Sequence, residues 1–139
     1  MEERFTYRAD IQEVPTIREN LATLQARWKI SNSEFRQILF IVEELFSNII
    51  RHGFQDTREH EVEVAIMKNT DHIVIEITDD GIPFDPVQYQ PESNSNPAHT
   101  EEGGMGLSLI KTFSDSFSYR RINQKNHLQV VKWLKTERH

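Results

Sequence analysis

Residues 31–53, SNSEFRQILFIVEELFSNIIRHG, are the stretch that decides the fold. Ser31 and Glu34 stand three residues apart, which is the spacing of a capping box at the start of a helix. The residues after them predict a helix with one wide apolar face that continues for four turns. That face consists of Phe35, Ile38, Leu39, Val42, Leu45, Phe46, Ile49 and Ile50. We expect the helix to end near His52 and Gly53, where glycine can take the left-handed cap conformation.

The same helix carries a polar stripe. Glu44, Asn48, Arg51 and His52 fall at i, i+4, i+7 and i+8, so they lie on one side of the helix. Such a stripe is commonly just the face that water covers. Asn48, however, is a mediocre helix former in mid-helix, one turn beyond a carboxylate. An amide oxygen can bind Mg²⁺ and a carboxylate can accept a proton from a nucleophile, so the stripe is also a candidate site.

The segments on both sides of this helix predict an α+β fold. Alternating polarity indicates strands, and apolar residues at helical spacing indicate two further helices. The order of these elements implies helices layered on one face of a mostly antiparallel sheet. The predictions are an edge strand at 4–9, a helix at 15–28, central antiparallel strands at 62–66 and 73–77 joined by a turn at 68–71, a helix over 107–117, and closing strands at about 117–122 and 127–134 with a turn at 123–126.

Two further segments are candidate binding elements. Asp79 follows a predicted buried strand, where its carboxylate can accept the amino hydrogen of adenine while Gly81 leaves room for the base; the alternative is an ordinary turn. Gly103, Gly104 and Gly106 precede the third predicted helix and form either a phosphate cradle or a flexible helix start. Between these segments the chain is polar and proline-rich, as expected of a functional lid or a disordered segment.

Composition limits the classes of function. The 139 residues fit a single domain spanning 1–139. There are no cysteines, so packing rather than disulfides has to hold the fold. The net charge of −6 makes nucleic acid an unexpected partner. Without a secretion-like start or a run of 18 apolar residues, we expect a cytoplasmic protein that makes no contact with the membrane.

Three segments, in this order, resemble the Bergerat-fold or histidine-kinase-like ATPases, and among them the bacterial anti-sigma-factor serine kinases. Residues 43–53 match the asparagine box of that family, residues 79–84 its first glycine box, and residues 103–107 its second. The resemblance implies a two-layer α/β sandwich whose mixed sheet is mostly antiparallel, with helices on one face. It also implies that residues 85–103 form the ATP lid.

The resemblance assigns roles to individual residues. Asn48 would coordinate Mg²⁺, Glu44 would be the general base, and Asp79 would bind adenine. Arg18 matches an arginine of the family that faces the protein partner, although a solvated arginine is the alternative. The remaining residues of the implied ATP-binding set are Arg51, His52, Gly81, Pro83, Gly103, Gly104, Met105, Gly106 and Leu107.

The function implied is an ATP- and Mg²⁺-dependent serine/threonine kinase that phosphorylates an anti-anti-sigma factor and sequesters a sigma factor, acting as a homodimer. One alternative is a regulatory module that binds ATP without catalysis, and another is a domain related to sensor histidine kinases.

Two departures from the family pattern bear on these alternatives. Pro83 stands where many members carry a second glycine. Residues 85–103 contain no Lys or Arg, although phosphoryl transfer requires compensation of charge on the γ-phosphate. Arg51, Lys111 or a residue from another subunit are candidates for that compensation.

Overall fold

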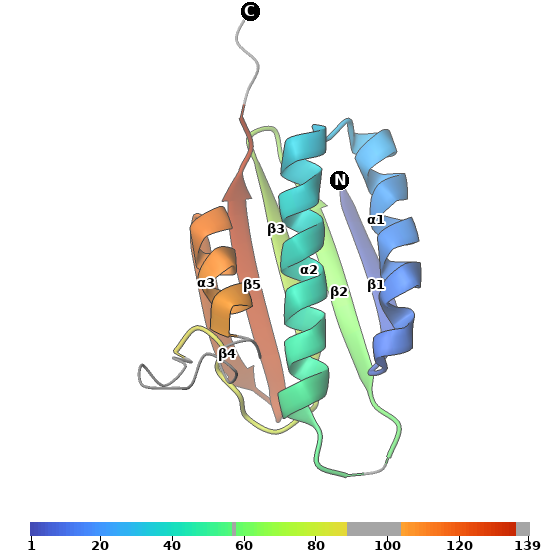
Figure 1. The fold of residues 1–139 in the computed structure, drawn as a ribbon, viewed down its shortest axis with the longest axis vertical. Helices are drawn as coiled ribbons and strands as arrows, with labels where there is room; N and C mark the ends of the chain where they lie inside the picture. The colour runs from blue at the N-terminus through green and yellow to red at the C-terminus, as the bar shows by residue number, and fades with distance from the viewer. Residues whose placement is uncertain (57, 89–103, 136–139) are drawn as a thin grey trace, which may run out of the picture.

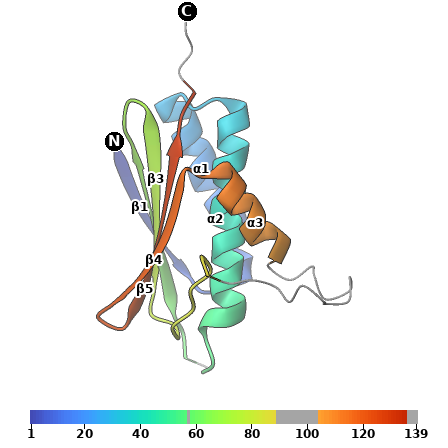
Figure 2. The same ribbon diagram turned by 90° about the vertical axis from the view of Figure 1, so that its left-hand side faces the viewer.

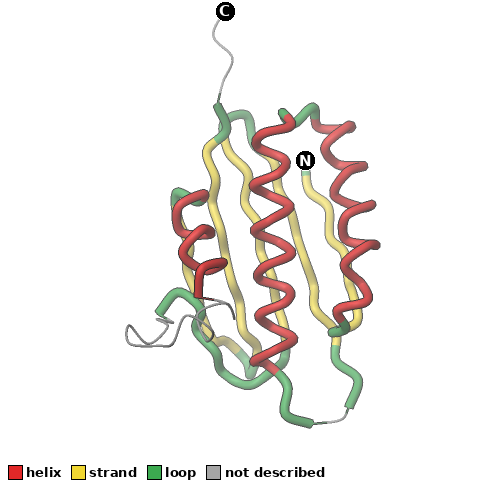
Figure 3. The backbone as a smooth tube through the Cα atoms, in the orientation of Figure 1, coloured by secondary structure: helices red, strands yellow, loops and turns green. Residues whose placement is uncertain are grey.

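A computed structural model describes residues 1–56, 58–88 and 104–135. The helices form one layer and a five-stranded sheet forms the other, as the two ribbon views show (Figures 1 and 2). In chain order the elements are β1 Glu2–Arg8, η1 Ile11–Glu13, α1 Val14–Trp28, α2 Asn32–Gly53, β2 Glu61–Lys68, β3 His72–Asp79, α3 Gly104–Phe113, β4 Ser116–Ile122 and β5 Lys125–Trp133. The expected layering of helices on one face of a sheet is confirmed (Figure 3).

The strands lie in the order β1-β2-β3-β5-β4, so β2 and β3 are inner strands as expected. Each of the four neighbouring pairs is antiparallel. The sheet in the described part of the chain is therefore antiparallel throughout and lacks the parallel pair of a mixed sheet. The β3–β5 register places Asp79 opposite Asn126.

Helix α2 begins as the capping pattern predicts. The Ser31 hydroxyl accepts a hydrogen bond from the Glu34 backbone N–H at 3.2 Å and donates one to Glu34 Oε1 at 2.8 Å. Its end differs from the expectation, because Gly53 is itself the last helical residue and Phe54 beyond it is extended at φ −126°. The prediction of a left-handed cap is therefore wrong. Instead, the Gly53 carbonyl accepts the backbone N–H of Ile82 at 2.7 Å, which satisfies a helix-end carbonyl without a special cap.

The hydrophobic core lies between the sheet and the helix layer. Helix α2 contributes its most buried side chains, with Ile41, Leu45 and Phe46 all at 0% exposure. On the sheet side, the alternation predicted for β3 places Ile73 and Ile75 against the helices, also at 0%. Helix α2 is thus held across the middle of the sheet, and the orientation of its polar stripe is set by this packing.

The C-terminal third differs from the prediction in two boundaries. Helix α3 stops at Phe113, and Phe117 belongs to β4 instead of extending the helix. The β4–β5 turn consists of Asn123 and Gln124, both at positive φ of 52° and 64°. Two consecutive residues in this region are typical of a tight type I′ hairpin, so Asn126 is paired in β5 and is not part of the turn.

Lys132 ties three elements together beneath the helix layer. Its Nζ donates to Gln37 Oε1 of α2 and, at 3.1 Å, to the carbonyl of Phe113 at the end of α3. Burial lowers the pKa of Lys132, while the nearby carboxylates of Glu34 and Asp115 act in the opposite direction. The contact fixes the short helix α3 against α2.

Candidate functional site

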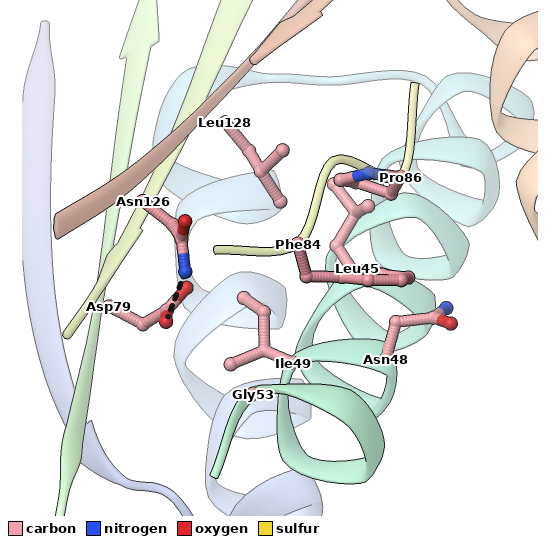
Figure 4. A pocket seen from close by; sticks show the side chains of 9 residues that line it. All are labelled: Leu45, Asn48, Ile49, Gly53, Asp79, Phe84, Pro86, Asn126 and Leu128. Atoms are coloured by element: carbon pink, nitrogen blue, oxygen red, sulfur yellow. Dashed lines mark hydrogen bonds between the residues drawn. The ribbon is translucent and has the colours of Figure 1, made fainter. Parts of the chain in front are cut away.

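The end of β3, the second half of α2 and the start of β5 meet around a small cavity. Figure 4 shows that the lining side chains come from these elements and from the loop after β3. The cavity measures about 10 Å³, which is room for roughly one water molecule and not for a purine base. Its lining residues are Leu45, Asn48, Ile49, Gly53, Asp79, Phe84, Pro86, Asn126 and Leu128.

Asp79 is a buried carboxylate at the end of β3, 3% exposed. Its Oδ1 accepts hydrogen bonds from the Gly81 backbone N–H at 2.8 Å and from Asn126 Nδ2 at 3.0 Å. Burial raises the pKa of Asp79, and the hydrogen bonds from Asn126 and Gly81 oppose that rise. A buried acceptor of this kind can recognise a donor group of a ligand.

Gly81 is required by a close approach of two backbones. A Cβ at this position would overlap the carbonyl oxygen of Gly53 and lie 2.9 Å from Asp79 Oδ1. The sequence interpretation gave Gly81 the role of leaving room for a base. The structure shows that the missing side chain of Gly81 makes room for the end of α2. This close approach brings the asparagine-box segment and the first glycine-box segment together.

Asn48 and Glu44 form the polar centre of α2. Asn48 is 2% exposed, and its Nδ2 donates to the Glu44 carbonyl at 2.7 Å and lies 3.3 Å from Glu44 Oε1. Asn48 Oδ1 is buried and has no hydrogen-bond partner among the residues that the structure describes. Buried acceptors are nearly always satisfied, so an orphaned one suggests a missing ligand. Asn48 is therefore not part of a face that is simply covered by water.

The start of α3 lies against the same carboxylate. A Cβ at Gly106 would overlap the Glu44 side chain, which shows how closely α3 approaches α2 at this point. Glu44 Oε1 also lies 3.8 Å from Arg51 Nη2. The segments of the asparagine box and the second glycine box are thus neighbours in space, with an acidic group and a helix N-terminus side by side.

The other predicted site residues take different positions. The His52 ring stacks on Phe84, with centroids 4.6 Å apart and planes at 21°. Pro83 is exposed and does not line the cavity, while Leu107 is a core residue at 2% exposure. Arg51 is exposed apart from its contact with Glu44.

Part of the predicted set lies outside the described residues. This applies to Gly103, to most of the predicted lid, and to the side chain of Met105, whose backbone belongs to α3. Gly104 is the first residue of that helix. In the described part of the lid, Asp85 Oδ1 accepts the Val87 backbone N–H at 2.9 Å.

Arg18 lies on α1 and outside the cavity. Its Nε donates to Glu43 Oε1, and its side chain is 59% exposed. Because Glu43 directly precedes Glu44 in the chain, Arg18 is linked to the site through α2.

Sequence reasoning missed Asn126 as part of the site, because it expected a turn there. Asn126 is 3% exposed and contacts Asp79 across a separation of 47 residues. Phe84 lies in the predicted glycine-box segment, but Pro86 was missed as a lining residue, since nothing in a polar, proline-rich stretch indicates which side chains turn inward. Among the helices in the described part of the chain, none has the length and apolar character needed to cross a bilayer.

Comparison with known proteins shows to which family the chain belongs. The chain is 27% identical to the serine-protein kinase RsbW of Bacillus subtilis, an alignment covering 94% of this chain and 84% of that protein. It is 32% identical to an anti-sigma F factor of Oceanobacillus iheyensis over 60% of this chain and 58% of that protein.

Two solved structures share the fold. One contains the RsbU and RsbW domains of a Mycobacterium tuberculosis protein, with a TM-score of 0.66 at 14% identity over 99% of this chain and 34% of that one. The other is the SiaB–SiaC complex of Pseudomonas aeruginosa, with a TM-score of 0.62 at 16% identity over 95% of this chain and 89% of the matched chain. The family model described as the histidine kinase-like ATPase domain matches residues 7–132. The chain therefore belongs to the histidine kinase-like ATPase domain family.

Proposed function

We propose that this protein is an ATP-dependent serine/threonine protein kinase that phosphorylates an anti-anti-sigma partner and sequesters a sigma factor. The names of its relatives, serine-protein kinase and anti-sigma F factor, support this assignment. The observation that carries it is the buried, orphaned Oδ1 of Asn48 one helical turn from the Glu44 carboxylate. A metal ligand and a base at this spacing suit phosphoryl transfer.

Asn48 fits a magnesium ligand. Mg²⁺ prefers oxygen ligands and is commonly held by one or two protein groups together with substrate phosphates. The amide of Asn48 is oriented by the bond from its Nδ2 to the Glu44 carbonyl at 2.7 Å, which leaves Oδ1 for the ion. When bound, Mg²⁺ would neutralise charge on the phosphates.

Glu44 is the proposed general base. Its carboxylate would accept the proton of a serine hydroxyl on the partner, while the serine oxygen forms a bond to the γ-phosphorus and the bond to the ADP oxygen breaks. Arg51 lies 3.8 Å from Glu44 and is the nearest described cation to it. We propose that Arg51 supplies part of the positive charge that residues 85–103 lack.

Asp79 is the proposed adenine acceptor, and the first turn of α3 the phosphate-binding end. Backbone N–H groups at a helix start favour anions, and Gly104 and Gly106 stand in that first turn. Because the cavity measures only about 10 Å³, some lining side chains have to move when a base enters, and we propose that these are Phe84 and Pro86 on the loop after β3. This movement would couple nucleotide binding to the loop after β3.

Arg18 is the proposed partner-binding residue, because it is exposed beside the catalytic helix and paired with Glu43. The family resemblance further suggests a cytoplasmic homodimer. Both remain proposals, as does the assignment of the entire chain to a single functional domain.

The decisive experiment measures transfer of radiolabel from γ-labelled ATP to an anti-anti-sigma protein. Glu44→Gln should still bind ATP while transfer falls by roughly 10²- to 10⁴-fold, the usual contribution of a general base. Glu76→Gln makes the same exchange on β3, where the side chain is only partly buried and bonds Gln129, and should transfer normally.

The outcomes separate the competing functions. Full transfer by Glu44→Gln would remove Glu44 from the reaction. If the unmodified protein binds the partner only with ATP and transfers no phosphate, the non-catalytic module is correct.

A further inference from the structure

Asn126 is a buried amide whose hydrogen-bonding capacity is fully used. Its Nδ2 donates to Asp79 Oδ1 at 3.0 Å and to the Ile82 carbonyl at 2.8 Å. Its Oδ1 accepts from the Tyr119 hydroxyl at 2.5 Å and from Arg121 Nη1 at 3.1 Å. An amide offers two donor hydrogens and an oxygen with two lone pairs, so all four positions are filled.

The neighbours determine which way this amide faces. Arg121 can only donate, so the amide oxygen has to face it. The carbonyl of Ile82 can only accept, so the amide nitrogen has to face the side where Asp79 lies. If the amide were flipped, its oxygen would face the acceptors of Asp79 and Ile82, and its N–H groups would face the Arg121 donor. Asn126 therefore presents a fixed N–H group to the Asp79 carboxylate, as the dashed line in Figure 4 shows.

This arrangement uses one of the two oxygens of Asp79 and leaves the other without a protein donor among the described residues. Oδ1 is occupied by donors from Gly81 and Asn126. Within the described ranges, no protein donor bonds Oδ2. A carboxylate held in this way is an acceptor with one oxygen left for a ligand.

We propose that Asn126 is a positioning residue that makes the site select 6-aminopurine over 6-oxopurine nucleotides by holding Asp79 as an acceptor. This inference rests on the proposed binding of adenine by Asp79. The amino group of adenine donates a hydrogen bond, whereas the oxygen at the same position of a 6-oxopurine only accepts. An acceptor facing an acceptor leaves both unpaired in a buried site, which strongly rejects the wrong ligand.

The charge on Asp79 matters to this selection, because a protonated carboxyl could donate to a 6-oxo group. Burial favours the protonated form and raises the pKa of Asp79, and Asp80 acts in the same direction. The hydrogen bonds from Asn126 and Gly81 and the charge of Arg121 oppose the rise. The field of Asp80 is itself moderated by His60, whose Nδ1 lies 3.0 Å from Asp80 Oδ1. Asn126 thus helps keep Asp79 in its accepting form.

The test compares calorimetric affinities for ATP and inosine triphosphate, both with Mg²⁺, in the unmodified protein and in Asn126→Asp. The unmodified protein should prefer ATP. The variant replaces the fixed N–H donor by an oxygen of the same shape, so at pH 8 ATP affinity should fall about 10- to 100-fold. Affinity for inosine triphosphate should change less, and the preference should shrink.

A pH profile separates positioning from a general structural role. As the pH falls from 8 toward 5, protonation of the new carboxyl restores a donor to Asp79, so ATP affinity in Asn126→Asp should recover. Gln129→Glu is the matched control, because it makes the same amide-to-acid exchange on β5 beside Glu76, with Gln129 Nε2 now 3.2 Å from Glu76 Oε1. Its preference between the two nucleotides should equal that of the unmodified protein.

Tyr119→Phe provides a second variant in case Asn126→Asp does not fold. It removes one donor to Asn126 Oδ1 and should reduce the preference in the same direction by a smaller factor. If the unmodified protein prefers ATP and both folded variants keep that preference, this inference is overturned while the proposed function stands. If the unmodified protein binds ATP and inosine triphosphate equally, this inference is overturned while the proposed function stands, and if it binds no ATP, both proposals fail.

Discussion

At the residue scale, Gly81 and Gly53 contact each other but differ in whether they can accept a larger side chain. A Cβ on Gly81 would overlap the Gly53 carbonyl oxygen, and backbone atoms there cannot give way cheaply. A Cβ on Gly53 would meet only Ile49 Cγ2 at 3.7 Å and Asp79 Oδ1 at 3.9 Å, which are ordinary contacts. The two positions therefore form a matched pair for substitution.

We expect Gly81→Ala to lower the free energy of unfolding by about 1–3 kcal/mol, in the range for overpacking. Gly53→Ala should leave it unchanged or raise it by up to about 1 kcal/mol, because alanine is the better helix former. Urea unfolding of the three proteins measures both values. Equal stabilities for the two variants would show that the close approach of residue 81 to α2 does not exist in solution.

His60 forms a second residue-scale feature beside the site. Its Nε2 lies 2.6 Å from Asp56 Oδ1, its Nδ1 lies 3.0 Å from Asp80 Oδ1, and its ring stacks on Phe54 with centroids 4.3 Å apart. The hydrogen bond with Asp56 is the largest cause that raises the pKa of His60, and the same bond lowers the pKa of Asp56. These contacts tie the segment after α2 to the end of β3.

The raised pKa gives the stabilising effect of His60 a definite pH dependence. A group whose pKa is higher in the folded than in the unfolded protein stabilises the fold. The full effect is present at pH values below the unfolded-state pKa, about 6.5 for histidine, and is lost as the pH rises through the folded-state pKa. We expect His60→Gln to be less stable than the unmodified protein at pH 6, with the difference shrinking by pH 9. Urea unfolding at both pH values checks this, and a difference that grows with pH would contradict it.

At the element scale, α2 depends on its first turn. Ser31 Oγ accepts the Glu34 backbone N–H at 3.2 Å, and Glu34 Oε2 in turn accepts the Lys135 backbone N–H at 2.7 Å, so the helix start also anchors the chain after β5. Loss of an N-cap side chain usually costs about 0.5–2 kcal/mol. We expect Ser31→Ala to lower the free energy of unfolding by that amount, as measured by thermal unfolding.

Ser33→Ala is the control for this element, because Ser33 is exposed in the first turn and its hydroxyl makes only a long contact of 3.5 Å with Ser31 Oγ, while the Glu34 N–H is capped by Ser31. Alanine is the better helix former there, so stability should be unchanged or slightly higher. A cost for Ser33→Ala equal to that for Ser31→Ala would mean that general disturbance of the first turn, and not the cap, is responsible.

At the scale of the whole molecule, ATP should bind to elements far apart in the chain and so stabilise the entire fold. Mass action gives about 2.7 kcal/mol at a ligand concentration one hundred times its dissociation constant. We expect ATP with Mg²⁺ to raise the melting temperature of the unmodified protein, and Asn48→Ala to lose most of that rise, because it lacks the buried Oδ1.

Asn69→Ala is the matched control for Asn48→Ala. Asn69 is exposed in the turn between β2 and β3, so its removal should leave the ligand-induced shift unchanged. A full shift in Asn48→Ala would show that Asn48 is not a metal ligand of the nucleotide site.

Much of the architecture was predictable because it depends on local patterns. Helix α2, the central β2–β3 hairpin and the layering of helices on one face follow from apolar spacing and capping residues. Element ends were less predictable. The end of α2 bonds Ile82 and the end of α3 bonds Lys132 of β5, and neither long-range bond has a local signature.

The sequence by itself determined which segments are candidates for the site, since Asn48 in mid-helix, Asp79 after a strand and clustered glycines can be read from order and spacing alone. Only the tertiary structure decided how these groups are arranged. Asn48 is buried beside Glu44, in the part of α2 that the start of α3 approaches, and Gly81 is needed because the loop crosses the end of α2. Asn126 meets Asp79 because β5 pairs with β3 in a register that places the two residues opposite each other, and such a pairing between strands distant in the chain has no local signature.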